Sequence, residues 1–199
     1  MKYFTREYWL SLQTCDYAPP PPERDPFLLY HAELELLRDR LAPEVFSFFA
    51  EADVHDGELV ELSVVDGNRP APLGEPAREW TYEPGYPVRV GLRVLDAYDR
   101  LVWTLRYSAV RRCVVKYNAD ADLFSSGSGG GFGFGDWGYH ELRDAGDGFL
   151  THEVLFATGN SLLVEFQGVT VRSEQARAAA KQRDGRKEKG RERKGGQES

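Results

Sequence analysis

Apolar residues recur at helical spacing in the first quarter of the chain, which predicts three helices. The first spans residues 5–14. The second begins at Asp25-Pro26, a capping residue followed by proline, which suits the first helical position. A third, short helix starts at Pro43 and ends before residue 56. The apolar stripe of the second helix consists of Phe27, Tyr30, His31, Leu34, Leu37 and Leu41.

After residue 57 the pattern changes to short runs of β-branched and aromatic residues separated by turn signals. Because the helices come first and the strands follow, the sequence predicts an α+β domain. We expect the N-terminal helices to pack on one face of a mainly antiparallel sheet with meander order, in a single domain over residues 1–173. The predicted strands are 58–65, 88–95, 100–107, 110–117, 139–142, 149–157 and 161–171.

One predicted hairpin has a two-residue turn at 97–98, a register that puts the apolar residues of both strands on one face. Its other face then carries Arg89, Arg93 and Arg106, with Arg89 directly opposite Arg106. Like charges in that position are unfavourable unless an anion or carboxylates lie between them. A small anionic ligand or an acidic protein surface would relieve the repulsion, which makes these arginines candidate binding residues. The alternative that we favour is neutralisation by the chain's own carboxylates, such as Glu33, Glu35 or Asp39.

A second candidate site is a row of polar side chains across three strands. If the turn after residue 143 is centred on Gly146, His140 lies directly opposite His152. The next turn, centred between residues 159 and 160, places Gln167 beside His152. These three residues could share a ligand, but they form an incomplete zinc site, because zinc takes three or four nitrogen, sulfur or carboxylate ligands. We predict no metal here and favour an ordinary polar sheet face.

The charge of the chain is unevenly distributed. Residues 1–173 carry 16 Lys and Arg against 27 Asp and Glu, whereas residues 174–199 carry 9 against 5. The acidic body repels a phosphate backbone, so we do not expect it to bind nucleic acid. The basic tail has no aromatic residue and no aliphatic residue larger than alanine. Such a segment cannot bury enough surface to offset its chain entropy, so we predict that the tail is disordered.

Several classes of protein are excluded by what the sequence lacks. No apolar run approaches the roughly 20 residues of a membrane-spanning helix, and the first residues do not resemble a secretion signal. Two cysteines, Cys15 and Cys113, favour a reducing, cytoplasmic setting over a disulfide scaffold. The Gly- and Ser-rich stretch 125–135 has no nucleotide-binding pattern, no serine sits in a nucleophile elbow, and each His-Glu pair lacks the second histidine of a zinc protease. We therefore predict no cofactor and no catalytic residue.

Three stretches resemble one bacterial family. They are the opening MKYFTREYW, the segment GDWGYHE at 135–141 and the segment HEVLFATG at 152–159. Together they are similar to the domain of unknown function 4085, found mainly in spore-forming Gram-positive bacteria, over about residues 1–171. The resemblance implies a small cytoplasmic bacterial protein, and it implies neither a catalytic residue nor a cofactor.

These observations favour a non-catalytic cytoplasmic protein that binds a protein or a small anionic ligand. The binding surface would be the sheet face or the aromatic-rich segments 80–86 and 132–139, because aromatic side chains on loops are common contact anchors. The alternative is a metal-dependent or small hydrolytic enzyme. It would be built on His140 and His152 with a nearby carboxylate, Asp136 or Glu165.

Overall fold

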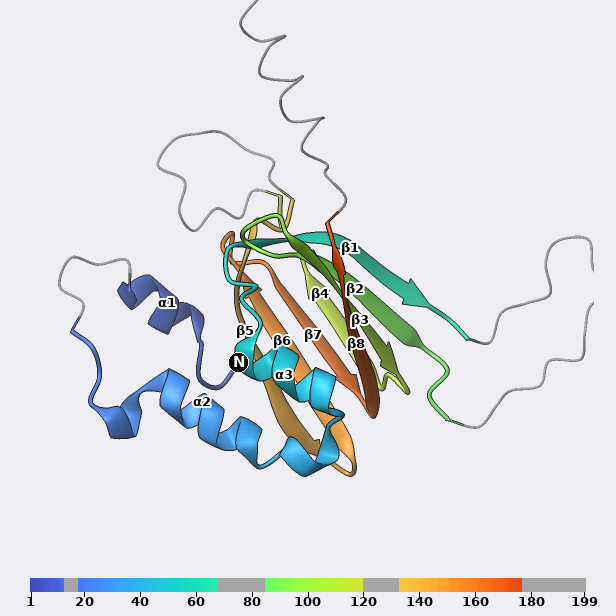
Figure 1. Ribbon diagram of the computed structural model, residues 1–199, viewed down its shortest axis with the longest axis horizontal. Helices are drawn as coiled ribbons and strands as arrows, with labels where there is room; N and C mark the ends of the chain where they lie inside the picture. The colour runs from blue at the N-terminus through green and yellow to red at the C-terminus, as the bar shows by residue number, and fades with distance from the viewer. Residues whose placement is uncertain (13–17, 68–84, 120–132, 177–199) are drawn as a thin grey trace, which may run out of the picture.

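The computed structural model describes residues 1–12, 18–67, 85–119 and 133–176 (Figure 1). Within these ranges, three α-helices and eight strands confirm the α+β class and the antiparallel sheet. No helix in the described residues is long and apolar enough to cross a membrane. The helices are α1 (Arg6–Leu12), α2 (Pro26–Glu35) and α3 (Pro43–Glu51), with the 3-10 turns η1 (Pro22–Arg24) and η2 (Arg38–Arg40). The strands are β1 (Gly57–Val65), β2 (Arg89–Leu95), β3 (Leu101–Ser108), β4 (Arg112–Lys116), β5 (Asp136–Gly146), β6 (Phe149–Phe156), β7 (Ser161–Phe166) and β8 (Gly168–Gln175).

Local sequence explains where the helices begin. α2 starts at Pro26 behind Asp25, whose side chain accepts a hydrogen bond from Phe27 N at 2.9 Å. α3 likewise has a proline, Pro43, at its first position. The apolar side chains that these two helices bury are Pro26, Tyr30 and Leu34 of α2, and Val45, Phe46, Phe48 and Phe49 of α3.

The strands form one antiparallel sheet in the order β4-β7-β6-β5-β1-β2-β3-β8. The groups β1-β2-β3 and β5-β6-β7 have the consecutive order of the predicted meander. The rest departs from it, since β4 pairs with β7 and β8 returns to β3. β1 meets β5 through only two residue pairs, Gly57 with Trp137 and Glu58 with Asp136. The sheet therefore consists of two halves that are narrowly joined between β1 and β5.

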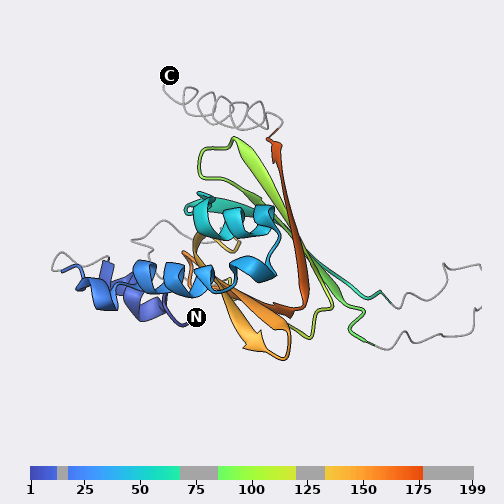
Figure 2. The same ribbon diagram turned by 60° about the horizontal axis from the view of Figure 1, so that its bottom comes forward.

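A bent two-stranded ribbon joins the two halves on their other side. β3 is separated from β4 by residues 109–111, and β7 is separated from β8 by Gln167 alone. Because β3 pairs with β8 and β4 pairs with β7, these four strands are in effect two long ones. The ribbon bends where Ala109 has a φ of 51°. Figure 2 shows the resulting V, with α3 in its opening. The ring of Tyr107 on β3 lies 4.8 Å from that of Phe166 on β7.

The helices contact β5 on different faces, which corrects the prediction that they all cover one face. Inside the V, Phe48 of α3 lies 5.6 Å from the ring of His140. The preceding residue of β5, Tyr139, points to the opposite face. There it lies 5.5 Å from the indole of Trp9 in α1. α2 lies beside the strand, where Tyr30 Oη accepts a hydrogen bond from the backbone N–H of residue 142 at 3.2 Å.

A bulge at Gly138 sets the direction of the side chains before it. The pairing of β5 with β6 shifts between Trp137 and Tyr139, which turns Trp137 to the same side as His140. A Cβ at residue 138 would overlap the Trp9 indole and would lie 2.7 Å from Leu155 O. Only glycine therefore fits at this position.

The last strand of the sheet ends beyond residue 173, where the sequence predicts the end of the folded domain. β8 runs to Gln175, which pairs with Leu101 of β3, so the strand continues past residue 173. The remainder of the predicted tail, 177–199, lies outside the described residues. The same is true of 80–84 in the first aromatic-rich segment and of 125–132 in the Gly- and Ser-rich stretch.

The substitution Gly138→Ala is expected to destabilise the protein by roughly 1–3 kcal/mol, the usual range for overpacking, because the new methyl group overlaps Trp9 and the Leu155 carbonyl. Urea denaturation measures the loss. In a Trp9→Ala background the same substitution should cost less, since one of the two clashes is gone. Equal costs in both backgrounds would contradict the packing of Trp9 on Gly138.

Candidate functional site

The structure brings His140 and His152 into contact. β5 and β6 pair His140 with Val154 and Leu142 with His152, so the two histidines are diagonal neighbours on one face. His140 Nδ1 lies 3.1 Å from His152 Nε2. On its other side, His152 Nδ1 lies 2.6 Å from the hydroxyl of Tyr107. The two histidines therefore meet as the sequence predicts, but the directly opposite register is wrong.

Gln167 does not join the histidines. The partner of His152 on β7 is Val164, three positions before the expected residue 167. The hairpin closes earlier than predicted, because Phe156 N–H donates to Asn160 O at 3.0 Å. A shift by an odd number of positions moves a residue to the other face of its strand. Gln167 is exposed and lies just after β7. The prediction that it forms a row with the two histidines is therefore wrong.

The histidine pair lies beneath α3, where His152 is fully buried and His140 is half-buried. The ring of Phe49 stacks on His140 at 5.5 Å and meets His152 at 4.9 Å, and Trp137 lies 5.6 Å from His140. Burial lowers the pKa of His140 to about 4. Burial, together with the neighbouring His140, holds the pKa of His152 well below its ordinary value. The polar sheet face favoured from the sequence is therefore wrong, because two neutral imidazoles lie in an aromatic interior.

Neutral imidazoles restrict how this cluster shares its protons. Each neutral ring has one N–H and one acceptor nitrogen, so the two hydrogen bonds of His152 must run in the same direction. Either Tyr107 donates to His152 and His152 donates to His140, or both bonds are reversed. Burial holds the pKa of Tyr107 well above its ordinary value, so its hydroxyl keeps its proton. The arrangement hydrogen-bonds three polar side chains within the core.

The carboxylates that the hydrolytic alternative requires lie elsewhere. Glu165 alternates with the core residue Val164 and forms an ion pair with Arg111. Burial, followed by the nearby charges of Asp56 and Glu58, raises the pKa of the Asp136 carboxyl. In the part of the chain that the structure describes, no group of three or more His, Cys, Asp or Glu side chains could hold a metal ion.

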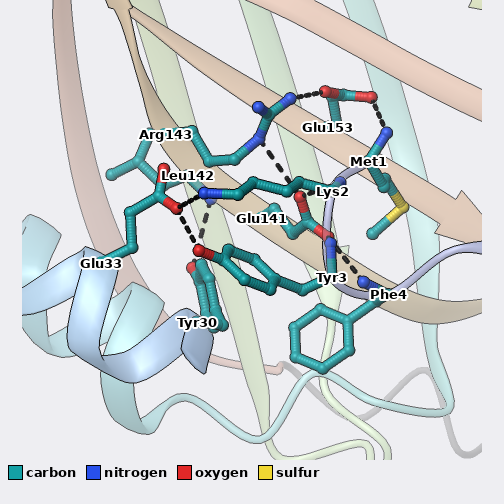
Figure 3. Close-up of polar contacts among 10 residues, drawn as sticks. All are labelled: Met1, Lys2, Tyr3, Phe4, Tyr30, Glu33, Glu141, Leu142, Arg143 and Glu153. Atoms are coloured by element: carbon teal, nitrogen blue, oxygen red, sulfur yellow. Dashed lines mark hydrogen bonds and ion pairs between the residues drawn. The ribbon is translucent and has the colours of Figure 1, made fainter. Parts of the chain in front are cut away.

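A third polar cluster, which sequence reasoning misses, ties the N-terminal segment to β5 and β6 (Figure 3). Glu141 of β5 is fully buried, and its carboxylate accepts backbone N–H bonds from Lys2 at 2.7 Å and from Tyr3 and Phe4 at 2.6 Å each. Arg143 Nε lies 3.2 Å from the same carboxylate. A buried charge is tolerated when it is paired and hydrogen-bonded in this way. Glu141 therefore anchors the first residues of the chain.

Two further carboxylates hold the same segment. Glu153 of β6 pairs with the Met1 ammonium and with Arg143. Although burial raises the pKa of Glu153, these two cations outweigh burial and hold it below its ordinary value. Glu33 of α2 lies 2.6 Å from Lys2 Nζ. These ion pairs join the N-terminal segment to α2 and β6, and the hydrogen bonds of Glu141 join it to β5.

The predicted arginines share one face of the sheet in a different register. β2 and β3 pair Gly91 with Arg106, so Arg89 is a diagonal neighbour of Arg106 and not its direct partner. The turn is longer than two residues, because the Asp96 side chain accepts a hydrogen bond from Arg100 N at 2.7 Å. The pairing shifts by two positions, an even number, so the same side chains remain on the outer face, where Arg89 and Arg106 are exposed and Arg93 is half-buried.

Carboxylates of the sheet neutralise Arg93. Its guanidinium lies 3.7 Å from Glu61 of β1 and 3.3 Å from Glu174 of β8. The helical carboxylates expected in this role, Glu33 and Glu35, bind other cations in the first forty residues. The neutralisation favoured from the sequence thus applies to Arg93, with different partners.

A further arginine joins this face. Arg172 of β8 lies opposite Thr104 of β3, two positions from Arg106. Arg89, Arg106 and Arg172 therefore form a diagonal across β2, β3 and β8, here called the arginine diagonal. All three are exposed, and within the described ranges none of them forms an ion pair. The alternation of Arg172 with buried Val171 is a sequence signal that would have found it.

The buried histidines predict loss of stability in mild acid. The pKa of His140 falls from 6.5 to about 4, so unfolding takes up a proton and stability present above pH 6.5 is lost as the pH falls toward 4. For His140 alone, the free energy of unfolding should fall by about 2 kcal/mol between pH 7 and pH 5. Urea denaturation at both pH values measures the change.

Two variants identify the source of this pH dependence. His140→Asn should reduce the loss, whereas His31→Asn, at an exposed residue of α2, should leave it unchanged. Glu153 and Asp144 have lowered pKa values, so the stability that they contribute is lost only below their ordinary pKa values near 4. That loss lies outside the range from pH 7 to pH 5. An equal loss in all three proteins would rule out a neutral buried pair.

The substitution Glu141→Gln is expected to destabilise the protein by roughly 2–4 kcal/mol. The amide cannot accept all three backbone N–H bonds, and it removes the negative charge that lies 3.2 Å from Arg143 Nε. Thermal denaturation at pH 7 measures the effect. Glu44→Gln, at an exposed residue of α3, is the matched control and should change stability little. Similar stability of the two variants would show that Glu141 is no anchor.

Comparisons with known proteins add no family to this description. A scan of the chain against protein-family models found no match. A search of curated proteins and a search of solved structures found none either. The resemblance to the domain of unknown function 4085 therefore stays a prediction.

Proposed function

We propose that the protein is a non-catalytic binding module that holds an anionic group of a partner on the arginine diagonal. The observation that supports this best is the position of Arg89, Arg106 and Arg172, exposed on one sheet face and without ion pairs in the described ranges. Guanidinium groups bind carboxylates and phosphates through paired hydrogen bonds, so three of them on one face favour an anion.

The core below this face holds it in place. Each arginine of the diagonal is next in sequence to a buried apolar residue, which is Val90, Leu105 or Val171. β3, at the centre, is paired along its length with β8 on one side and with β2 on the other. A preorganised surface lowers the ordering cost of binding. Because exposed ion pairs contribute only about 0.2–1 kcal/mol each, a partner must engage several of these arginines together.

The net charge of the chain limits the size of the anion. The formal net charge is −7, so the molecule as a whole repels a large polyanion. Attraction therefore depends on the local charge of the arginine diagonal. Exposed charges are screened beyond about 8 Å at physiological ionic strength, so binding should weaken as salt is added.

We infer a cytoplasmic setting for this binding. Cys113 is a free, half-buried thiol, and Cys15 lies outside the described residues. Two cysteines in a chain of 199 residues support a reducing compartment better than a disulfide-linked secreted protein.

Charge reversal on the diagonal tests the proposal. With labelled hexaglutamate and inorganic tripolyphosphate as probes, Arg106→Glu should lower affinity by about tenfold or more, because it replaces a charge-assisted contact with a like charge. Fluorescence anisotropy and calorimetry measure the affinities at low salt. Arg24→Glu, the same reversal at an exposed residue of η1, should bind as the unchanged protein does. If neither probe binds, or if both variants bind equally, the proposal is wrong.

A further inference from the structure

We infer that the anionic partner is an extended acidic polypeptide segment that crosses β2, β3 and β8 and presents carboxylates at alternate positions. This inference rests on the proposed function, because it names the partner of the same face. Its support is the spacing of the three arginines, the low surface between them and the charges at the margin.

The spacing of the arginine diagonal matches that of an extended peptide. Arg89 and Arg106 are diagonal neighbours, and so are Arg106 and Arg172. Diagonal positions on neighbouring strands are about 7–8 Å apart. In an extended chain every second side chain points to the same side, with about 6.4–6.8 Å between them. Carboxylates at positions i, i+2 and i+4 of a peptide therefore reach the three arginines in turn.

The surface between the arginines is low and polar. Gly91 and Thr170 flank Arg106, and Thr104 lies between Arg93 and Arg172. A Cβ at residue 91 would lie 2.7 Å from Ser63 Oγ, so glycine keeps this part of the face flat. A peptide backbone can therefore approach the sheet closely, and the threonine hydroxyls can bond to its peptide groups.

Two carboxylates at the margin favour a short anion. Glu174 lies two residues beyond Arg172 on β8, and Glu61 of β1 is paired with Arg93. Both carboxylates also form an ion pair with Arg93, and these contacts hold the two carboxylates on the face that carries the arginine diagonal. A polyanion with a charge at every step that continued past Arg172 would meet Glu174, whereas a peptide with three carboxylates would end before it. Nucleic acid binding depends on many phosphate contacts, so the local charges favour the peptide.

Two labelled nine-residue peptides of equal composition test the spacing. One alternates three glutamates with serines, and the other holds the three glutamates in one block. The alternating peptide should bind about tenfold more tightly, as expected when one more charge-assisted contact forms. Anisotropy at low salt measures both affinities. Arg106→Glu should remove the preference together with most of the binding, and Arg24→Glu should change neither.

Charge exchange separates direct contact from general attraction. A variant with Arg89, Arg106 and Arg172 all changed to glutamate should lose the acidic peptide and bind an alternating lysine–serine peptide instead. The three sites are exposed, and circular dichroism shows whether the fold is kept. If the triple variant does not fold, Arg172→Glu serves in its place. The loss of affinity caused by Arg172→Glu should be small for a peptide that lacks the third glutamate, because that peptide does not reach Arg172.

The outcomes separate the inference from the proposed function. Equal binding of the two acidic peptides, with loss of both in Arg106→Glu, would overturn the alternating spacing and leave anion binding in place. Tighter binding of single-stranded DNA of equal charge, with the same dependence on Arg106, would overturn the peptide as partner. If no anionic probe binds in a way that depends on Arg106, the proposed function itself fails.

Discussion

The bend in the ribbon of β3–β4 and β7–β8 determines where the histidine pair and the arginine diagonal lie. Because both long strands change direction near Ala109 and Gln167, the two halves of the sheet face each other across α3. Side chains that point inward from the two halves form one core, in which Tyr107 of β3 reaches His152 of β6. On the outer face of β2, β3 and β8, Arg89, Arg106 and Arg172 stay exposed. The bend thus places the histidine pair on the inner face of the sheet and the arginine diagonal on its outer face.

Strand β5 shows how polar groups are accommodated in such a fold. His140 points into the V and Glu141 points away from it, yet both lie under other elements. Each has partners within the chain, since His140 bonds to His152 and Glu141 accepts three backbone N–H groups. Partners of this kind offset the cost of removing polar groups from water. Both clusters therefore stabilise the fold and need no ligand to explain them.

The sequence predicts the elements and the exposed arginine face, but not the contacts between distant segments. Turn lengths are the weakest step, because side-chain hydrogen bonds such as that of Asp96 lengthen a turn without changing the apolar pattern. An error of two positions leaves Arg89 and Arg106 on one face, whereas an error of three removes Gln167 from the histidines. No local pattern links Glu141 to Lys2, since only the folded chain brings them together. The bend at Ala109 is hidden for the same reason.

The charged side chains of this protein fall into two groups, those with an ion-pair partner within the described residues and those without one. Glu141, Glu153 and Arg143 bind one another or the N-terminal segment, so their charges are used within the fold. Arg93 is likewise neutralised by two strands of its own sheet. The arginine diagonal has no such partner among the described residues, although a neutral polar side chain at each position would fit the same exposed face. Three charges without an ion pair among the described residues, aligned at the spacing of an extended peptide, support the proposed acidic partner.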